Sequence, residues 1–334
     1  MSNMDQVEFN ADSFSNELLL QQIGQSVENC YDTSHFRSVK ADLFFLARHK
    51  LWEEEKPFYL NIPVPEGRER TNFRGQIHKV QIHDIRGHEN TFKLDECSFQ
   101  VMQESTPVPF HRIQNIESQY IPSIELFLRD VLNASEVYAF DYTRRTSSPE
   151  KIMEQEGNLL RSPGYVVHCG KIEKFPRQQL LTDLGFYLKY SDQTPKAALA
   201  RLKRHLELGA KAQAPKRIMI VNVWRPIFGP LKDSPLAFCD ARTVNGVDLV
   251  PSDLIFPGYR GEKFDIMYND TQKWFYLSDM NENEVLLMKQ FDSVKEGVAR
   301  FCPHAAFKDP RITDVPKPTE SIEVRVLVVF DEIN

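Results

Sequence analysis

Short β-like runs rich in apolar residues recur along most of the chain. Examples are RIMIVNVW (217–224), DLVPSDLIF (248–256) and SIEVRVLVVF (321–330). Short apolar runs bounded by turn residues are typical of strands. Because such runs are many and helical spacing is concentrated earlier in the chain, the pattern predicts a β-sandwich or barrel with a helical flank.

Helical spacing of apolar residues is confined to a few segments. It predicts three helices, over residues 38–51, 116–132 and 281–293. A fourth helix is expected to begin at Thr194, which can cap it, and to stop at Gly209. The run 76–102 alternates on both sides of Arg86-Gly87 and predicts a β-hairpin with its turn there.

The same pattern suggests how the chain divides. Residues 1–37 are polar with a few amphipathic spots, so we expect an N-terminal arm followed by one domain over 38–334. Residues 164–172 predict a buried strand within that domain. We find no repeat of 20–50 residues and no glycine-rich phosphate loop, which argues against a solenoid or a nucleotide-binding fold.

Composition excludes several classes of partner. The net charge is −6, with 26% charged residues, and Lys and Arg do not cluster, so we expect neither nucleic acid nor an anionic membrane surface as partner. No stretch approaches the roughly 18 apolar residues that span a bilayer. The polar N-terminus lacks the apolar core of a signal peptide, and the five scattered cysteines fit reduced thiols, so we expect a cytoplasmic protein.

Four segments carry more specific motifs. They are DIRGHENTFKLDECSFQ, NVWRPIFGPLKDSPLAFCD, KWFYLSDMNENEVLLMKQFDS and ESIEVRVLVVF. In these segments the chain resembles the non-haem iron, 2-oxoglutarate-type hydroxylase/desaturase family of fungi and bacteria, which includes cephalosporin-methoxylation and gibberellin-desaturase-like proteins. The resemblance covers residues 40–331 and implies a double-stranded β-helix, or jelly roll. That architecture agrees with the mainly β pattern.

The resemblance also implies a set of functional residues. The family carries a His-x-Asp motif before a capped helix, a second histidine near the end, and an arginine on the last strand that anchors 2-oxoglutarate. Two histidines and one carboxylate bind Fe(II) and leave positions open for co-substrate and dioxygen. His304 in CPHAAF matches the second histidine, and Arg325 in ESIEVRVLVVF matches the anchor.

Two alignments remain open for the His-x-Asp motif. One uses DQTP and places the carboxylate at Asp192, but the histidine position is then Tyr190. We prefer it because the following helix and the distance to NVWRP fit better. The other keeps the histidine at His168 but places Gly170 where the carboxylate belongs, and it needs a long insertion.

Either alignment lacks one of the three ligands. A phenol is a poor ligand for Fe(II) at neutral pH, because a free tyrosine titrates near ~10. We therefore expect no metal and no cofactor, with Fe(II) and 2-oxoglutarate as the alternative.

The broken ligand set is similar to that of jelly-roll proteins that catalyse hetero-Diels–Alder reactions in fungal tropolone sesquiterpenoid pathways. The resemblance implies a cofactor-independent pericyclase of meroterpenoid biosynthesis. Such an enzyme joins an o-quinone methide, made from a tropolone or phenol, to a humulene-type alkene. Its partners would be small apolar molecules, and a homodimer is one option for its assembly.

Acid/base roles for this reaction fall to four residues. His304 or Arg225 would assist departure of hydroxide, and Asp192 or Tyr190 would accept the phenolic proton. Trp224, Arg325 and His168 are the expected substrate-binding residues. A pocket lined by such residues would hold two reactants in contact and exclude water.

Other interpretations of the same residues stay open. Arg225 could form a structural ion pair with Asp233 or Asp240, and His304 could be a core histidine. An ion pair between Arg325 and Glu323 is expected to be less favoured. For the whole protein, the alternatives are an Fe(II)/2-oxoglutarate-dependent oxygenase (a hydroxylase or desaturase of a natural product) and a non-catalytic binding protein.

Overall fold

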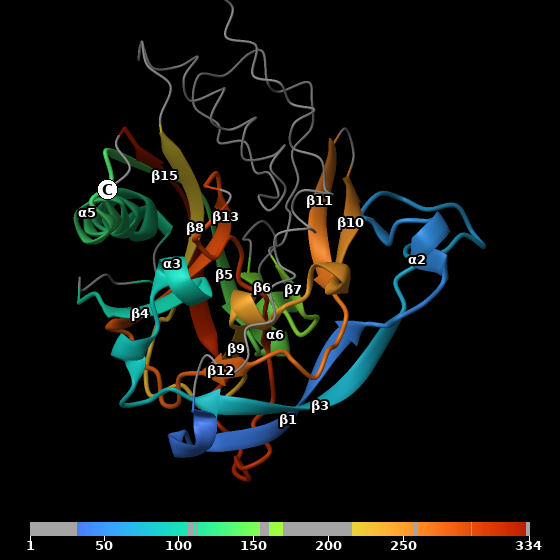
Figure 1. The fold of residues 1–334 in the computed structure, drawn as a ribbon, viewed down its shortest axis with the longest axis horizontal. Helices are drawn as coiled ribbons and strands as arrows, with labels where there is room; N and C mark the ends of the chain where they lie inside the picture. The colour runs from blue at the N-terminus through green and yellow to red at the C-terminus, as the bar shows by residue number, and fades with distance from the viewer. Residues whose placement is uncertain are drawn as a thin grey trace, which may run out of the picture.

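A computed structural model of the chain describes residues 32–105, 110, 113–153, 160–169, 216–256, 259–294 and 296–331. In these ranges two curled sheets face each other (Figure 1). The larger sheet runs in the order β1 (Ser38–Leu46), β3 (Gly75–Asp84), β12 (Trp274–Tyr276), β9 (Leu236–Cys239), β14 (His304–Ala306), β7 (His168–Cys169), β11 (Tyr259–Ile266), β10 (Leu249–Phe256) and β2 (Phe58–Leu60). The smaller runs in the order β4 (Phe99–Gln103), β13 (Glu284–Asp292), β8 (Arg217–Pro226), β15 (Glu320–Phe330), β5 (Glu136–Thr146) and β6 (Leu160–Arg161). This is the expected jelly roll.

Short helices join and flank the strands. The α-helices are α2 (Leu51–Glu54), α3 (Leu94–Cys97), α4 (Ile113–Asn115), α5 (Ile121–Leu132) and α6 (Pro149–Met153). The 3₁₀ turns are η2 (Thr33–His35), η3 (Glu89–Thr91), η6 (Ala241–Thr243) and η7 (Gly246–Asp248), and η4 (Ile116–Tyr120) is a π-helical turn that leads into α5. None of the described helices is long and apolar enough to cross a membrane.

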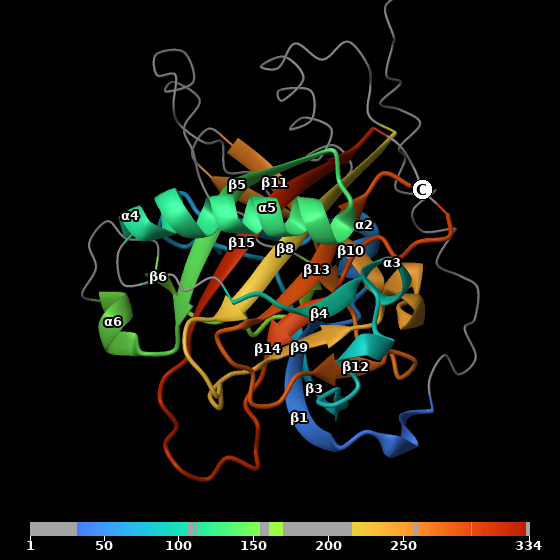
Figure 2. The ribbon, with the colours of Figure 1, turned by 90° about the vertical axis from the view of Figure 1, so that its left-hand side faces the viewer.

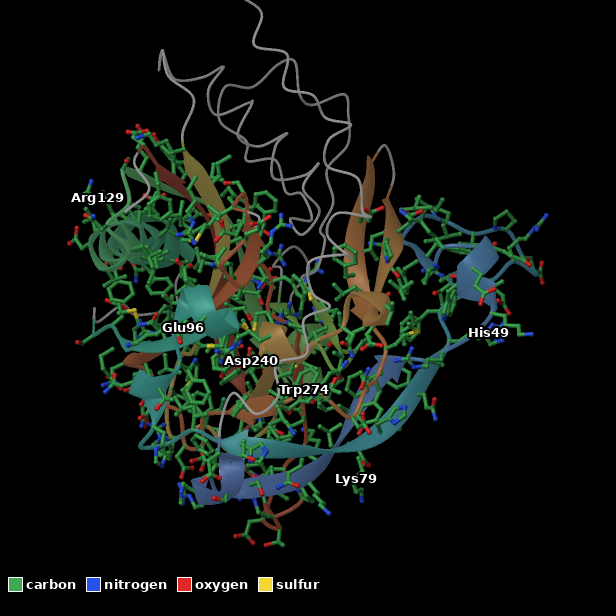
Figure 3. The ribbon with its side chains drawn as sticks, viewed as in Figure 1. His49, Lys79, Glu96, Arg129, Asp240 and Trp274 are labelled. Carbon is green, nitrogen blue, oxygen red and sulfur yellow. The ribbon has the colours of Figure 1, made fainter. Side chains whose placement is uncertain are left out.

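Helix α5 covers the outer face of the smaller sheet (Figure 2). Its buried Ile124 and Leu128 lie one turn apart and pack on the outward side chains of β8 and β15, such as Val223 and Val324. The alternate residues of the same strands, such as Trp224, therefore face the interior between the sheets. Figure 3 shows Trp274 in the interior and Lys79 and Arg129 at the outer surface.

Several sequence predictions are confirmed. The helix over 116–132 is formed by η4 and α5, and the β-like runs near 217, 249 and 321 are the strands β8, β10 and β15. The short strand β7 ends at Cys169, inside the expected strand 164–172. The arm over 1–37 and the helix from Thr194 lie almost wholly or wholly outside the described residues.

Three predictions are wrong. Residues 38–46 form the strand β1, whose buried Val39, Ala41 and Leu43 follow a period of two that was misinterpreted as helical. Residues 284–292 form β13, which is buried at every position, and a short apolar run of that kind does not distinguish a strand from a helix. The hairpin over 76–102 does not exist, because β3 and β4 belong to different sheets.

Candidate functional site

Two histidines from adjacent strands meet inside the jelly roll. His168 on β7 and His304 on β14 are direct partners in the antiparallel pairing of these strands. Directly opposite residues point to the same face of a sheet. The two rings lie with their centroids 4.9 Å apart and their planes inclined by 47°, and both side chains are buried.

Backbone carbonyls fix the orientation of both rings. Nδ1 of His168 lies 2.6 Å from the carbonyl oxygen of Val166, and Nδ1 of His304 lies 2.9 Å from that of Cys302. A carbonyl oxygen can only accept, so Nδ1 is the donor in both rings and, in a neutral imidazole, Nε2 carries the lone pair. This is the tautomer that a metal ion requires when it binds through Nε2.

The electrostatic surroundings favour the neutral form of His304. Burial lowers its pKa most, and the positive charges of Arg145 and Arg325 lower it further. The carboxylate of Glu323 and the hydrogen bond to Cys302 oppose these effects but do not outweigh them. His304 is therefore a neutral base or ligand at physiological pH.

A small pocket adjoins the pair. Its lining includes His168, His304, Trp224, Arg145 and Glu323, and its volume of about 20 Å³ holds a single water molecule. Gly164 also lines it, and a Cβ there would lie only 3.3 Å from Cε1 of His168. A glycine at this position thus leaves room for the imidazole.

Arg325 lies on the inner face but is engaged by carboxylates. Its guanidinium donates to Asp141 Oδ2 at 2.8 Å and to Glu323 Oε1 at 3.2 Å. The ion pair with Glu323 was expected to be less favoured, and that expectation is wrong because residues two apart on a strand share a face. Arg145 also lies 3.8 Å from Glu323 Oε2.

Arg225 lies on the opposite face of the same sheet. It donates to Glu104 Oε2 at 2.6 Å and sits 5.3 Å from the ring of Phe110 and 5.4 Å from that of Tyr120. The structure does not bring it to the histidine pair, so its expected catalytic role is corrected to a structural one. The partner is Glu104, whereas the expected candidates Asp233 and Asp240 pair with Lys308 and Arg242.

Tyr190, Asp192 and Gly170 lie outside the described residues. Within the described ranges, no group of three or more His, Cys, Asp or Glu side chains is arranged to hold a metal ion. The described part of the chain therefore brings together the two histidines without a third side chain of these types. The position of His168 beside His304 favours the alignment that we preferred less.

Sequence reasoning missed several polar and charged residues at or near the pocket. Arg145 lines it, and Asp141, Arg161 and Asn222 also come from strands of the smaller sheet. A signal was available, because charged residues at alternate positions of an otherwise apolar strand indicate a polar inner face.

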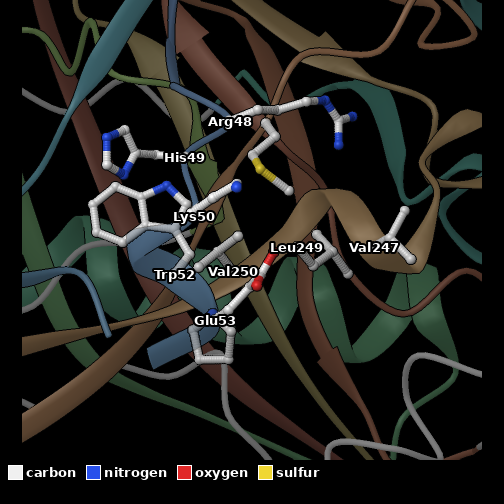
Figure 4. A pocket seen from close by; sticks show the side chains of 10 residues that line it. Arg48, His49, Lys50, Trp52, Glu53, Val247, Leu249 and Val250 are labelled. Atoms are coloured by element: carbon white, nitrogen blue, oxygen red, sulfur yellow. The ribbon is translucent and has the colours of Figure 1, made fainter. Parts of the chain in front are cut away.

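A cavity larger than the pocket at the histidine pair lies elsewhere in the described ranges. It has a volume of about 530 Å³ and lies between the segment from Arg48 to Glu53 and the start of β10 (Figure 4). It shares no lining residue with the pocket at the histidine pair.

Comparison with known proteins gives consistent matches. A family model described as "Oxidoreductase/YMDC permease-like domain" matches residues 43–185 and 187–329. The Fe(II)/2-oxoglutarate-dependent dioxygenase NvfI of Aspergillus novofumigatus is 31% identical over 82% of this chain and 91% of its own length. The hydroxylase/desaturase EfuI of Hormonema carpetanum is 28% identical over 78% of this chain and 87% of its own length.

A solved structure supports the same grouping. The iron and alpha-ketoglutarate-dependent endoperoxidase NvfI matches with a TM-score of 0.69 at 26% identity, over 88% of this chain and 99% of that chain.

Proposed function

Because this chain belongs to the oxidoreductase family that contains these fungal hydroxylases and desaturases, we propose that it is an oxygenase of fungal secondary metabolism. Its substrate would be a small organic molecule bound in the interior of the jelly roll. The observation that carries the proposal is the pairing of His168 with His304, with the lone pair of each ring on Nε2.

The two histidines suit Fe(II). Neutral imidazoles are common ligands of this ion, and both rings here are fixed by backbone hydrogen bonds of the kind that orient metal-binding histidines. When bound, Fe(II) with 2-oxoglutarate supplies oxidation of the substrate by dioxygen. The protein's own contribution is a buried site, in which Trp224 forms a wall and Glu323 orients two arginines.

The third ligand depends on how the His-x-Asp motif is interpreted. The first half of the motif matches Val167-His168-Cys169, and the second half matches Asp192-Gln193-Thr194-Pro195. Residues 170–191 stand between the halves. The two matches of the family model also meet inside this stretch, at residues 185 and 187. We infer that the carboxylate is Asp192, separated from His168 by an insertion.

A second candidate function rests on Gly170, which follows Cys169 where the family has its carboxylate. A chain that binds no iron could use the same pocket as a cofactor-independent hetero-Diels–Alderase. It would join an o-quinone methide, from a tropolone or phenol, to a humulene-type alkene. Neutral His304 would then act in proton transfer, and the enclosed site would protect the reactive intermediate from water.

Anaerobic addition of Fe(II) and 2-oxoglutarate to the purified protein tests the first candidate. We expect a metal-to-ligand charge-transfer absorption band, followed by succinate release when dioxygen is admitted. His168→Ala and His304→Ala should each abolish the band. His78→Ala is the matched control, because His78 stacks on Tyr268 away from the site, and it should leave the band unchanged.

The opposite result has a clear meaning. Absence of the band and of succinate, together with metal-free conversion of a hydroxymethyl tropolone or phenol and humulene into the cycloadduct, would replace the oxygenase by the cyclase.

A further inference from the structure

The strand β1 forms one margin of the larger sheet and leaves part of its edge open. It is paired with β3 on one side over its whole length, from Ser38 to Leu46. On its other side, the described residues reach only the last part of the strand, where the N–H of Val167 donates to the carbonyl oxygen of Phe44. Figure 1 shows β1 as the outermost strand at the lower margin of the sheet. An open edge of this kind can pair with a strand of another chain.

Hydrogen bonds at the two ends of β1 show which main-chain groups point to the open edge. The carbonyl oxygen of Arg37, just before the strand, accepts from the N–H of Asp84 on β3, so this residue faces β3. The carbonyl oxygen of Phe44 accepts on the opposite side. Main-chain groups alternate in direction along an antiparallel strand, so those of Lys40 and Asp42 point to the open edge. In the described part of the chain, no main-chain hydrogen bond engages them there.

The side chains along this edge carry a charge pattern that is complementary to itself. Lys40 and Asp42 are both exposed, and they flank the buried Ala41. When two copies of β1 run antiparallel with Ala41 opposite Ala41, Lys40 of each copy lies directly opposite Asp42 of the other. The nearest other registers that keep the same faces place Lys40 opposite Lys40 or Asp42 opposite Asp42, and like charges directly opposite are destabilising. Charge therefore selects one register.

The neighbouring strand continues the same pattern. Lys79 on β3 is the direct partner of Asp42 and is also exposed at the outer surface (Figure 3). In a symmetric pair of β1 strands, Asp42 would lie between Lys79 of its own chain and Lys40 of the second copy. Opposite charges on adjacent strands are favourable, so the carboxylate gains from both sides. A lysine on an edge strand usually keeps other strands away, but here an aspartate two residues further on supplies its partner.

We propose that the chain forms a symmetric dimer in which the β1 strands of two copies pair edge to edge, centred on Ala41. Lys40 of one copy and Asp42 of the other exchange both of their main-chain hydrogen bonds, and their side chains form ion pairs across the interface. The pairing ends at Phe44, because its carbonyl oxygen is already engaged by Val167. The larger sheets of the two copies thus become one continuous sheet. This inference does not depend on which reaction the protein catalyses.

Sedimentation equilibrium of the purified full chain, up to about 100 µM, tests the dimer. We expect the native protein to associate reversibly, and more weakly as salt is added, because exposed charges are screened. Lys40→Glu opposes two carboxylates across the interface, and Asp42→Lys opposes two ammonium groups. Each substitution should lower the association constant by about tenfold or more, because it makes two favourable pairs repulsive.

Two combinations of these variants separate strand pairing from other effects of the substitutions. An equimolar mixture of Lys40→Glu and Asp42→Lys should form a heterodimer, because every opposed pair then carries opposite charges again. The double variant Lys40→Asp with Asp42→Lys exchanges the two charges and should regain self-association. Neither recovery is expected if the single substitutions act by disturbing the fold.

Arg129→Glu is the matched control, because it makes the same change of net charge as Lys40→Glu. Arg129 is exposed on α5, which covers the outer face of the smaller sheet, away from β1 (Figure 2). Its substitution should leave the association constant within about twofold of the native value, because charges separated by more than a Debye length are largely screened.

A native chain that stays monomeric over the whole concentration range would overturn the inference. Dimers that form only after removal of residues 1–31 would do so as well, and would assign the edge to the chain's own N-terminal arm. Dimers that persist unchanged in both Lys40→Glu and Asp42→Lys would also contradict it, because the interface would then lie elsewhere on the molecule.

Discussion

Arg225 and Arg325 show how one step along a strand decides what a residue does. Both are buried arginines on neighbouring strands of the smaller sheet, and each has a carboxylate within hydrogen-bond distance. Arg225 lies on the side of Val223 and therefore packs under the helical flank with Glu104. Arg325 lies on the other side, in the interior near the histidines. The residue type alone does not separate these roles. The face of the sheet does, because successive side chains on a strand point to opposite faces.

The position of Arg225 predicts that its substitution lowers the free energy of unfolding strongly and leaves turnover unchanged. Arg225→Met leaves Glu104 as a buried carboxylate without its guanidinium, which should cost about 3–5 kcal/mol in the free energy of unfolding measured with urea. The double variant Arg225→Met with Glu104→Leu should be more stable than Arg225→Met. Activity per folded molecule should match the native protein, and a selective loss of turnover with normal stability would restore Arg225 as a catalytic residue.

At the scale of elements, the turn after β3 connects the two sheets through side-chain contacts. Arg86 lies just after β3 of the larger sheet, and its guanidinium binds both oxygens of Glu284 at the start of β13, with NH2 to Oε2 at 3.0 Å. It also donates to the carbonyl oxygen of Ser278. Burial raises the pKa of Glu284, but the bond and charge of Arg86 and the N–H of Asn281 outweigh it, so the pKa lies below the usual 4.5.

The contact between Arg86 and Glu284 predicts that Arg86→Gln lowers the free energy of unfolding by an amount that depends on pH. Because the pKa of Glu284 is lower in the folded state, its contribution is present above the unfolded value near 4.5 and is lost as the pH falls through the folded value. Urea denaturation at pH 7 should show a loss of about 1.5–3 kcal/mol, typical of a charged hydrogen bond. The difference from the native protein should shrink below pH 4.5. The exposed pair of Lys232 and Asp279 provides the control, and Lys232→Gln should change stability by less than about 1 kcal/mol.

At the scale of the whole molecule, residues 170–191 separate the two halves of the proposed ligand motif. Removal of residues 170–191 would join Cys169 directly to Asp192 and give the sequence His-Cys-Asp-Gln-Thr-Pro. Residues two apart on a strand point to the same face, so the carboxylate would then share a face with His168. This arrangement in sequence is the basis of the proposal that Asp192 supplies the motif's carboxylate.

A deletion of residues 170–191 is expected to raise the affinity for Fe(II) by about 10–100-fold, the usual effect of better orientation of a group at a metal site. Titration of the deletion variant with Fe(II) under anaerobic conditions measures this. Asp192→Asn in the deletion background is the control and should cancel the gain. No increase, or an increase that Asp192→Asn leaves in place, would contradict Asp192 as the third ligand. Sequencing of the transcript would show whether a chain without this stretch is also made naturally.

The fold was predictable where a short β-like run showed no helical spacing. The strands β8 and β15 were predicted from such runs, whereas β13 was interpreted as a helix, although all three strands are buried at nearly every position. The pairing of strands was harder, because β3 and β4 are close in sequence and alternate like a hairpin, yet they enter different sheets. Local pattern specifies elements, and only the packing of the whole chain specifies their partners.

The site was predictable only in part for a similar reason. His304 and His168 were both identified, but their contact depends on a pairing between strands that lie far apart in sequence. Arg145 and Arg161 were not identified, because neither belongs to a motif and their contact comes from the short parallel pairing of β5 with β6. Arg225 was misassigned because its side of the sheet could not be read from NVWRP alone.

The spacing of the two imidazoles has a consequence for how this protein could change over time. The two histidines are direct partners in the pairing of β7 with β14, and each ring is held by a main-chain carbonyl. Bulky or small residues could therefore be exchanged at Trp224, Leu236 and Ala306, which line the same pocket, without displacing the pair. A scaffold built this way can change the residues that line the pocket while the two histidines keep their positions.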